Sequence, residues 1–157
     1  LRSISMKSMR FKRDEILGKR VSSSELTAGD MCSLFLERQE RRISIGEVSR
    51  RHFTDNLRSC RVLVDYLGKL TRAASLRAAD FPAFKAAFPS TWGPEKAGNE
   101  IQRIRICFKW ALESDLIPAL PNFSPDFRKP SRTVRRRDQQ QRQAERGGRR
   151  DFTADEI

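Results

Sequence analysis

Apolar side chains recur at helical spacing along this chain, in segments that glycine and proline separate. The longest segment, 94–117, follows Gly93 and begins with Pro94, a residue that a helix tolerates in its first turn. At 100° per residue one arc of this segment is apolar and faces a core; it consists of Ala97, Ile101, Ile104, Phe108, Ala111 and Leu112. The opposite flank carries Lys96, Asn99, Arg103 and Trp110. Pro118 predicts that this helix ends near residue 117.

Three shorter helices are predicted before it. The first spans 27–43, with Thr27 as a plausible N-cap, and the second spans 49–67, with Ser49 as N-cap and Gly68 as C-cap. The third spans 78–88 and has phenylalanines at i, i+3 and i+7. No segment alternates as a half-buried strand does, so the chain is predicted to be an all-α bundle of four main helices.

Charge is the strongest feature of the composition. The 157 residues include 32 Lys and Arg against 20 Asp and Glu, a net charge of +12. The excess lies at the ends, because residues 1–20 have a net charge of +5 and residues 128–150 one of +8, whereas residues 21–127 contribute only +2. Such a chain favours a polyanionic partner, nucleic acid first and an anionic membrane second.

These patterns divide the chain into four parts. Residues 1–24 are predicted to be a flexible basic arm and residues 25–120 a helical domain. Residues 121–150, rich in proline, glutamine and arginine, are interpreted as a basic linker and not as a folded element. In residues 151–157, Thr153 and Glu156 form a capping box, which predicts the start of a further helix and domain.

Few other residues indicate a metal site, a disulfide or a membrane segment. Cys32, Cys60 and Cys107 are widely spaced and lie on or beside apolar stripes, so they are interpreted as reduced core residues, with a zinc site or a disulfide less favoured. No apolar run has the length of a membrane span, and no signal peptide is recognised. We expect a soluble, cytoplasmic protein without a cofactor or metal.

Residues 26–157 resemble the core-binding domain of tyrosine recombinases, the phage integrase family, and in particular integrases of the planctomycete type. The residues that carry the resemblance are 26–36, 46–49 with Phe53, 67–68, 91–117, 127–131 and 152–157. In that family the domain is a small helical, SAM-like bundle that covers one face of the recombination site. A basic linker then passes along the DNA to the catalytic domain on the other face.

The resemblance implies that the catalytic residues belong to a domain that would follow Ile157. The chain has one tyrosine, Tyr66, and one histidine, His52, and both are predicted to be surface or structural residues of the second helix. A phosphoryl-transfer site needs several convergent cations and a base. We therefore expect no enzymatic activity from this chain alone.

Double-stranded DNA is the expected partner, bound through the starts of the second and fourth helices and through the linker. The predicted DNA-binding residues are Arg50, Arg51, Trp92, Lys96, Asn99, Arg103, Lys129, Arg132, Arg135, Arg136 and Arg137. Asn99 is the residue type suited to adenine. Trp92 fits two roles, a core anchor, which is favoured, and a surface that packs on deoxyribose. For Arg50 and Arg51 a solvated helix face is as plausible as an anion contact.

The sequence is compatible with two other hypotheses. The chain could be a protein-interaction module that pairs with itself or with an intact integrase, which an exposed Ile106 and Trp110 would favour. It could also be the remnant of a disrupted gene.

Overall fold

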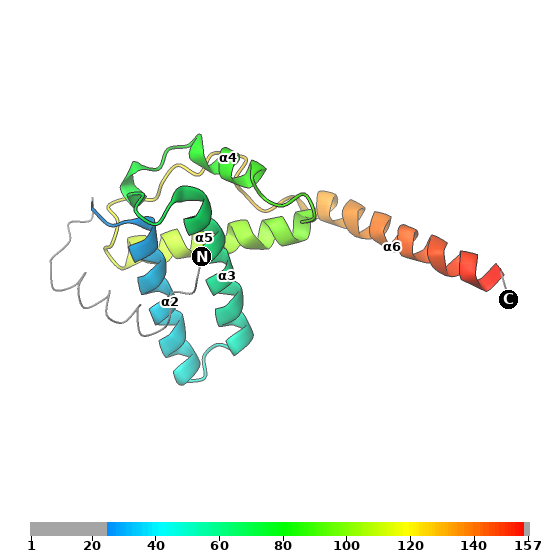
Figure 1. Cartoon of the computed structure of the whole chain (residues 1–157), viewed down its shortest axis with the longest axis horizontal. Coiled ribbons are helices and arrows are strands. Elements are labelled where there is room, and N and C mark those ends of the chain that lie inside the picture. Colours follow the sequence, from blue (N-terminus) through cyan, green and yellow to red (C-terminus); the bar gives the residue numbers. More distant parts are fainter. Residues whose placement is uncertain (1–24, 156–157) are drawn as a thin grey trace.

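Helices account for all the regular structure of the computed structural model, which describes residues 25–155 (Figure 1). In chain order the elements are α2 (Ala28–Ser44), α3 (Arg50–Leu67), the 3-10 turn η1 (Ala73–Ser75), α4 (Asp80–Ala86), α5 (Pro94–Glu113) and α6 (Arg132–Asp155). These residues form no strand, so the all-α prediction is confirmed. The predicted arm, 1–24, lies outside the described residues.

Two of the helix starts that were predicted from capping signals, those after Thr27 and Ser49, are confirmed. Thr27 Oγ1 accepts a hydrogen bond from the Asp30 backbone N–H at 3.1 Å, and Ser49 Oγ accepts one from the His52 N–H at 3.2 Å. Helix α3 ends at Gly68, whose φ of +89° suits a residue without a Cβ. These signals act within three or four residues, which is why a single sequence reveals them.

Helices α2, α3 and α5 pack against one another and enclose the core. The apolar stripe of α5 is buried as predicted at Ile101, Ile104 and Phe108. Trp110 is not an exposed residue, since it is partly buried and its ring centroid lies 5.6 Å from that of Phe35. Of Ile106 and Trp110, the two residues whose exposure would favour an interaction module, only Ile106 is exposed, at 47%.

Helix α5 ends at Glu113, four residues before the predicted end. Asp115 adopts a left-handed φ of +57°, and its N–H donates to the Leu112 carbonyl at 3.1 Å. The Leu116 N–H then donates to the Ala111 carbonyl at 2.9 Å. This pair of bonds is a Schellman cap, and an aspartate in place of the usual glycine conceals it in the sequence.

The first part of the predicted linker belongs to the core, contrary to our interpretation. Phe123 and Phe127 are buried in an aromatic cluster with Phe81 and Phe84 of α4 and Phe108 of α5. The Phe123 ring centroid lies 4.8 Å from that of Phe81, and the Phe127 centroid 5.1 Å from it. Helix α4, shorter than the predicted 78–88, is held to α5 largely through these rings.

The second part of the predicted linker is helical, a further correction. Residues 131–147 contain no proline and consist mainly of arginine, glutamine, glutamate and alanine, which favour helix. Ser131 Oγ accepts from the Val134 N–H at 3.4 Å at the start of α6. The α6 backbone continues through Thr153, so no new helix begins there, while Glu156 of the predicted capping box lies outside the described residues.

Helix α6 extends away from the other helices (Figure 1) and is predominantly polar, with Val134 as an exposed apolar side chain. A helix of this kind needs a partner or many side-chain pairs to be stable. Within residues 25–155, none of the helices is long and apolar enough to cross a membrane.

Candidate nucleic-acid interface

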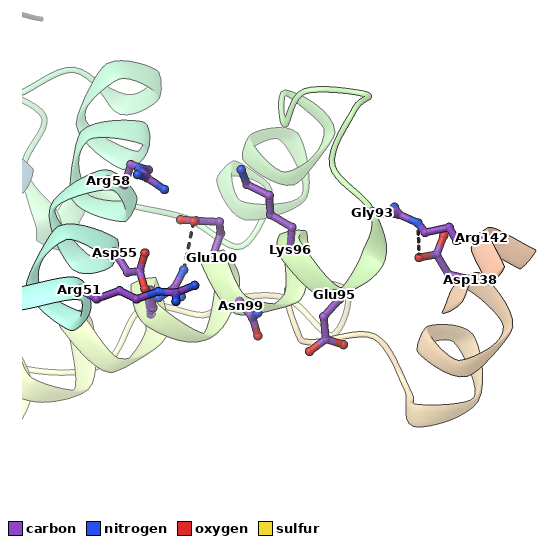
Figure 2. Close-up of a pocket in the computed structure, with 11 residues that line it drawn as sticks. Arg51, Asp55, Arg58, Gly93, Glu95, Lys96, Asn99, Glu100, Asp138 and Arg142 are labelled. Atoms are coloured by element: carbon purple, nitrogen blue, oxygen red, sulfur yellow. Dashed lines mark hydrogen bonds and ion pairs between the residues drawn. The ribbon is translucent and has the colours of Figure 1, made fainter. Parts of the chain in front are cut away.

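A cleft of about 350 Å³ separates the first half of α3 from the first half of α5 and is bordered by α6 (Figure 2). It is lined by Arg51, Asp55 and Arg58 of α3, by Glu95, Lys96, Asn99, Glu100 and Arg103 of α5, and by Gly93, Asp138 and Arg142. Four residues predicted to bind DNA therefore meet here, although 52 positions separate Arg51 from Arg103.

Three cations of the cleft make no ion pair with any described residue. These are Arg51, Arg58 and Lys96, which approach the cleft from two helices (Figure 2). The lining is not uniformly positive, because its five basic side chains stand beside four acidic ones. An anion placed in the cleft would therefore be attracted by these three unpaired cations more than by the net charge of the lining.

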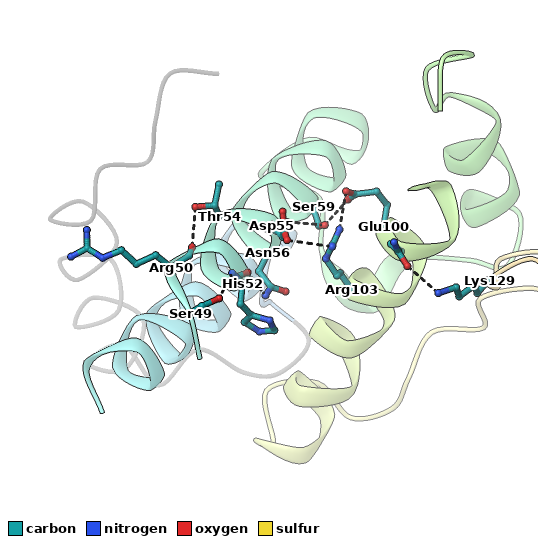
Figure 3. A network of polar contacts seen from close by, with 11 residues as sticks. Ser49, Arg50, His52, Thr54, Asp55, Asn56, Ser59, Glu100, Arg103 and Lys129 are labelled. Carbon is teal, nitrogen blue, oxygen red and sulfur yellow. Dashed lines mark hydrogen bonds and ion pairs between the residues drawn. The ribbon is translucent and has the colours of Figure 1, made fainter. Parts of the chain in front are cut away.

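Arg103 is held in an ion-pair network that joins α3 to α5 (Figure 3). Its guanidinium lies 3.2 Å from Glu100 Oε1 and 3.6 Å from Asp55 Oδ2. Glu100 is only 4% exposed and also accepts a hydrogen bond from the Ser59 hydroxyl. A buried carboxylate requires such partners, so Arg103 stabilises the wall of the cleft and has little charge left for a phosphate.

Seven of the predicted residues do not line the cleft, and Arg50 and Trp92 are the two of them that precede α5. Arg50 is exposed at the start of α3, and its side chain points away from Arg103 (Figure 3). Trp92 is partly buried, with its ring centroid 5.0 Å from that of Phe88 and with Lys96 Nζ 4.9 Å above the ring. The packing on Phe88 supports the core-anchor role of Trp92, and the ring positions Lys96 by a cation–π contact.

Asn99 already has a partner at its carbonyl oxygen. Lys129 Nζ donates to Asn99 Oδ1 at 3.0 Å, which leaves the amide NH₂ group to donate elsewhere. The chain before α6 crosses α5 at Gly98, where an added Cβ would lie 2.7 Å from Lys129 Cγ and 2.9 Å from Pro130 Cδ. Glycine at this position allows Lys129 to reach Asn99.

Glu95 fixes the start of α6 against the start of α5. Its carboxylate lies 3.2 Å from Lys129 Nζ and 3.2 Å from Arg135 Nη1. Hydrogen bonds from Arg135 and then Lys129 lower the pKa of Glu95 below its ordinary value of 4.5. Two of the predicted DNA-contacting cations therefore serve first to dock α6.

The arginines of α6 gather mainly on one face. At 100° per residue an arc of about 120° contains Arg132, Arg135, Arg136, Arg142 and Arg146. Asp138 borders this arc and lies 3.0 Å from Arg142, whereas Arg137 is exposed on the opposite side. The basic run that was interpreted as a linker is therefore an ordered basic face, and Arg142 of this face borders the cleft.

Sequence reasoning missed Arg58, Glu95 and Arg142 as cleft residues. Arg58 follows Arg51 by seven positions, two turns of helix, so helical spacing alone puts both on one face. Arg142 could not be found in this way, because its place in the cleft depends on α6 being helical.

His52 and Tyr66 lie where the sequence predicted. Both are exposed residues of α3, and the Tyr66 ring packs on Phe84 with a centroid separation of 5.0 Å. Neither lines the cleft.

Comparison of the chain with protein-family models, curated proteins and solved structures gives no match. The recombinase resemblance accordingly rests on the residues quoted above.

Proposed function

We propose that this chain is a DNA-binding module of the tyrosine recombinase type, equivalent to the core-binding domain and without catalytic activity of its own. The observation that supports this most is the convergence of Arg51, Arg58 and Lys96 on one cleft, next to the basic face of α6. Cations without acidic partners release counterions from DNA when they bind phosphates, which favours association.

The cleft and the basic face of α6 suit two parts of one duplex. Helix α6 has 24 residues, so it is about 36 Å long at 1.5 Å per residue, the length of roughly ten base pairs. In this arrangement the cleft holds one stretch of backbone and α6 follows the phosphates beyond it. DNA would then be the partner that α6, as a polar helix extending from the bundle, needs for stability.

Most of these contacts are to phosphates, so sequence preference is expected to be limited. Asn99 is the best candidate for a base contact, through its free amide NH₂ group. To use both of its polar atoms on adenine, Asn99 would have to share its carbonyl oxygen with Lys129 or release it.

Neutral substitutions test the cleft without repelling its acidic residues. A variant with Arg51→Gln, Arg58→Gln and Lys96→Gln should bind a fluorescent duplex at least about tenfold more weakly than the unmodified chain at low salt. The matched control is Lys69→Gln, Arg72→Gln and Lys109→Gln, which removes three exposed cations that do not line the cleft. Equal affinities of the two variants would contradict the proposal, provided that circular dichroism shows both to be folded.

The alternative, an interaction module that pairs with itself or with an integrase, is favoured by a different surface. Ile106 and Leu120 are exposed beside Phe123 in an apolar hollow of about 320 Å³. Light scattering separates the hypotheses, because a dimer that forms without DNA favours the interaction module and a salt-sensitive complex with DNA favours the binding module.

A further inference from the structure

The three cysteines of the chain meet in the core, each from a different helix. Cys32 lies on α2, Cys60 on α3 and Cys107 on α5, and their sulfur atoms all lie within 4.8 Å of one another. All three are free thiols, 1%, 5% and 2% exposed respectively. Residues separated by 28 and 47 positions in the sequence thus form one cluster of sulfur atoms.

The cluster has the size of a single-ion site. An ion at the centre of a triangle with sides of 4.8 Å lies about 2.8 Å from each corner. Bonds from a metal to a thiolate are about 2.3 Å long, as for zinc. Each sulfur would therefore move by about half an ångström, which small changes of side-chain torsion supply.

Coordination number and charge narrow the class of ion. No His, Asp or Glu of the described residues belongs to the cluster, so the protein offers three sulfur ligands and no fourth. Structural zinc sites prefer four protein ligands, and three thiolates around a divalent ion would leave a negative charge in the core. Three thiolates around a trivalent ion carry no net charge and avoid this cost.

We propose that Cys32, Cys60 and Cys107 form a buried three-sulfur site for a thiophilic trivalent metalloid, with arsenic(III) as the ion that fits it. Arsenous acid, As(OH)₃, reacts with three thiols to form three As–S bonds. Each As–O bond breaks and each thiol proton leaves with the hydroxide, which gives three molecules of water. No electron is transferred and no charge is buried.

The folded chain should bind the ion better than the unfolded chain. In the unfolded chain, three-sulfur coordination requires closing loops of 28 and 47 residues, which costs entropy. In the folded chain α2, α3 and α5 have already brought the sulfurs together. The bound ion then links all three core helices and stabilises the bundle.

The test uses the full chain, kept reduced with a phosphine because thiol reductants compete for arsenic, and incubated with sodium arsenite. Native mass spectrometry should show one added arsenic less three hydrogens. The melting temperature should rise by roughly 5 to 10 °C at an arsenite concentration about 100 times the dissociation constant. Cadmium ions, tested in parallel, should stabilise the chain less because their three-thiolate complex is charged.

Two variants separate loss of the site from loss of stability. Cys60→Ala should lose both the added arsenic mass and the thermal shift. Val64→Ala, which shortens another buried side chain one helical turn along α3, should retain both. The proposal is overturned if the folded chain takes up no arsenic, if arsenite lowers the melting temperature, if cadmium stabilises more than arsenite, or if Cys60→Ala binds arsenic as well as the unmodified chain does.

Discussion

Phe127 should be one of the largest single contributors to the stability of this protein, although its sequence segment was predicted to be a linker. Its side chain is 0% exposed, and its ring centroid lies 5.1 Å from that of Phe81 and 6.0 Å from that of Phe84. The Phe127 carbonyl also accepts a hydrogen bond from Arg105 Nη1 at 2.8 Å. Phe127→Ala leaves a cavity among these rings, and such a change in a core costs about 3–5 kcal/mol.

The core and linker interpretations of residues 121–130 predict very different losses of unfolding free energy for Phe127→Ala. A linker phenylalanine would change stability by about 0.5 kcal/mol or less. With a urea slope of about 2 kcal/mol per molar, the core interpretation predicts that the unfolding midpoint falls by roughly 2 M. The free energy of unfolding is measured by urea titration with far-UV circular dichroism.

Two further variants control for unfolding of the alanine variant and for nonspecific effects of substitution near this segment. Phe127→Leu, which keeps most of the volume, should cost less than about 1.5 kcal/mol and remains measurable if the alanine variant unfolds. Leu120→Ala changes an exposed side chain immediately before this stretch and should cost little. A loss below about 1 kcal/mol for Phe127→Ala would refute the assignment of this segment to the core.

Two more predictions concern ion pairs at the cleft. Arg103→Gln should lower the free energy of unfolding by about 1–3 kcal/mol, because buried Glu100 loses its cation. Breaking a fully buried ion pair costs more, but the Arg103 side chain is 28% exposed. Adding Glu100→Gln should recover part of this loss in urea titrations, and strict additivity of the two substitutions would contradict the pairing. The pKa of Glu95 is lower in the folded protein than its ordinary value of 4.5, which the unfolded chain retains. The ion pairs of Glu95 therefore stabilise the docking of α6 fully at a pH above 4.5, and this stabilisation is lost as the pH falls through the lower, folded-state pKa. The NMR signal of the Arg135 side chain should follow that loss and should become insensitive to acid in Glu95→Gln; an unchanged acid response in that variant would argue against the contact.

The starts of α2, α3 and α5 could be predicted because their causes are local. Thr27 and Ser49 lie within three residues of the N–H groups that they cap, and Pro94 marks the first turn of α5 by its own geometry. The apolar stripes of α3 and α5 predicted the core for the same reason, since spacing along one helix determines which side chains share a face.

The two parts of the predicted linker were misinterpreted for different reasons. Phe123 and Phe127 stand among prolines, and only the rings of α4 and α5 make them core residues. Helix α6 is predominantly polar, so it lacks the apolar periodicity by which the other helices were recognised.

The same distinction holds for the candidate interface. Single-helix spacing could have added Arg58 to Arg51, but the pairing of Arg103 with Asp55 and Glu100 appears only once α3 and α5 cross. The meeting of three cysteines likewise follows from three-helix packing and not from their spacing in the sequence.

The salt dependence of duplex binding tests the proposed function most directly. Within the part of the chain that the structure describes, three unpaired cations of the cleft and three exposed, unpaired arginines on the basic face of α6, Arg132, Arg136 and Arg146, give roughly six phosphate contacts. The logarithm of the binding constant should therefore fall with the logarithm of the salt concentration with a slope of about −5. Replacing Arg51, Arg58 and Lys96 with glutamine should reduce this slope to about −3. Absence of measurable binding at about 50 mM salt, or an unchanged slope in that variant, would contradict a DNA-binding role for the cleft.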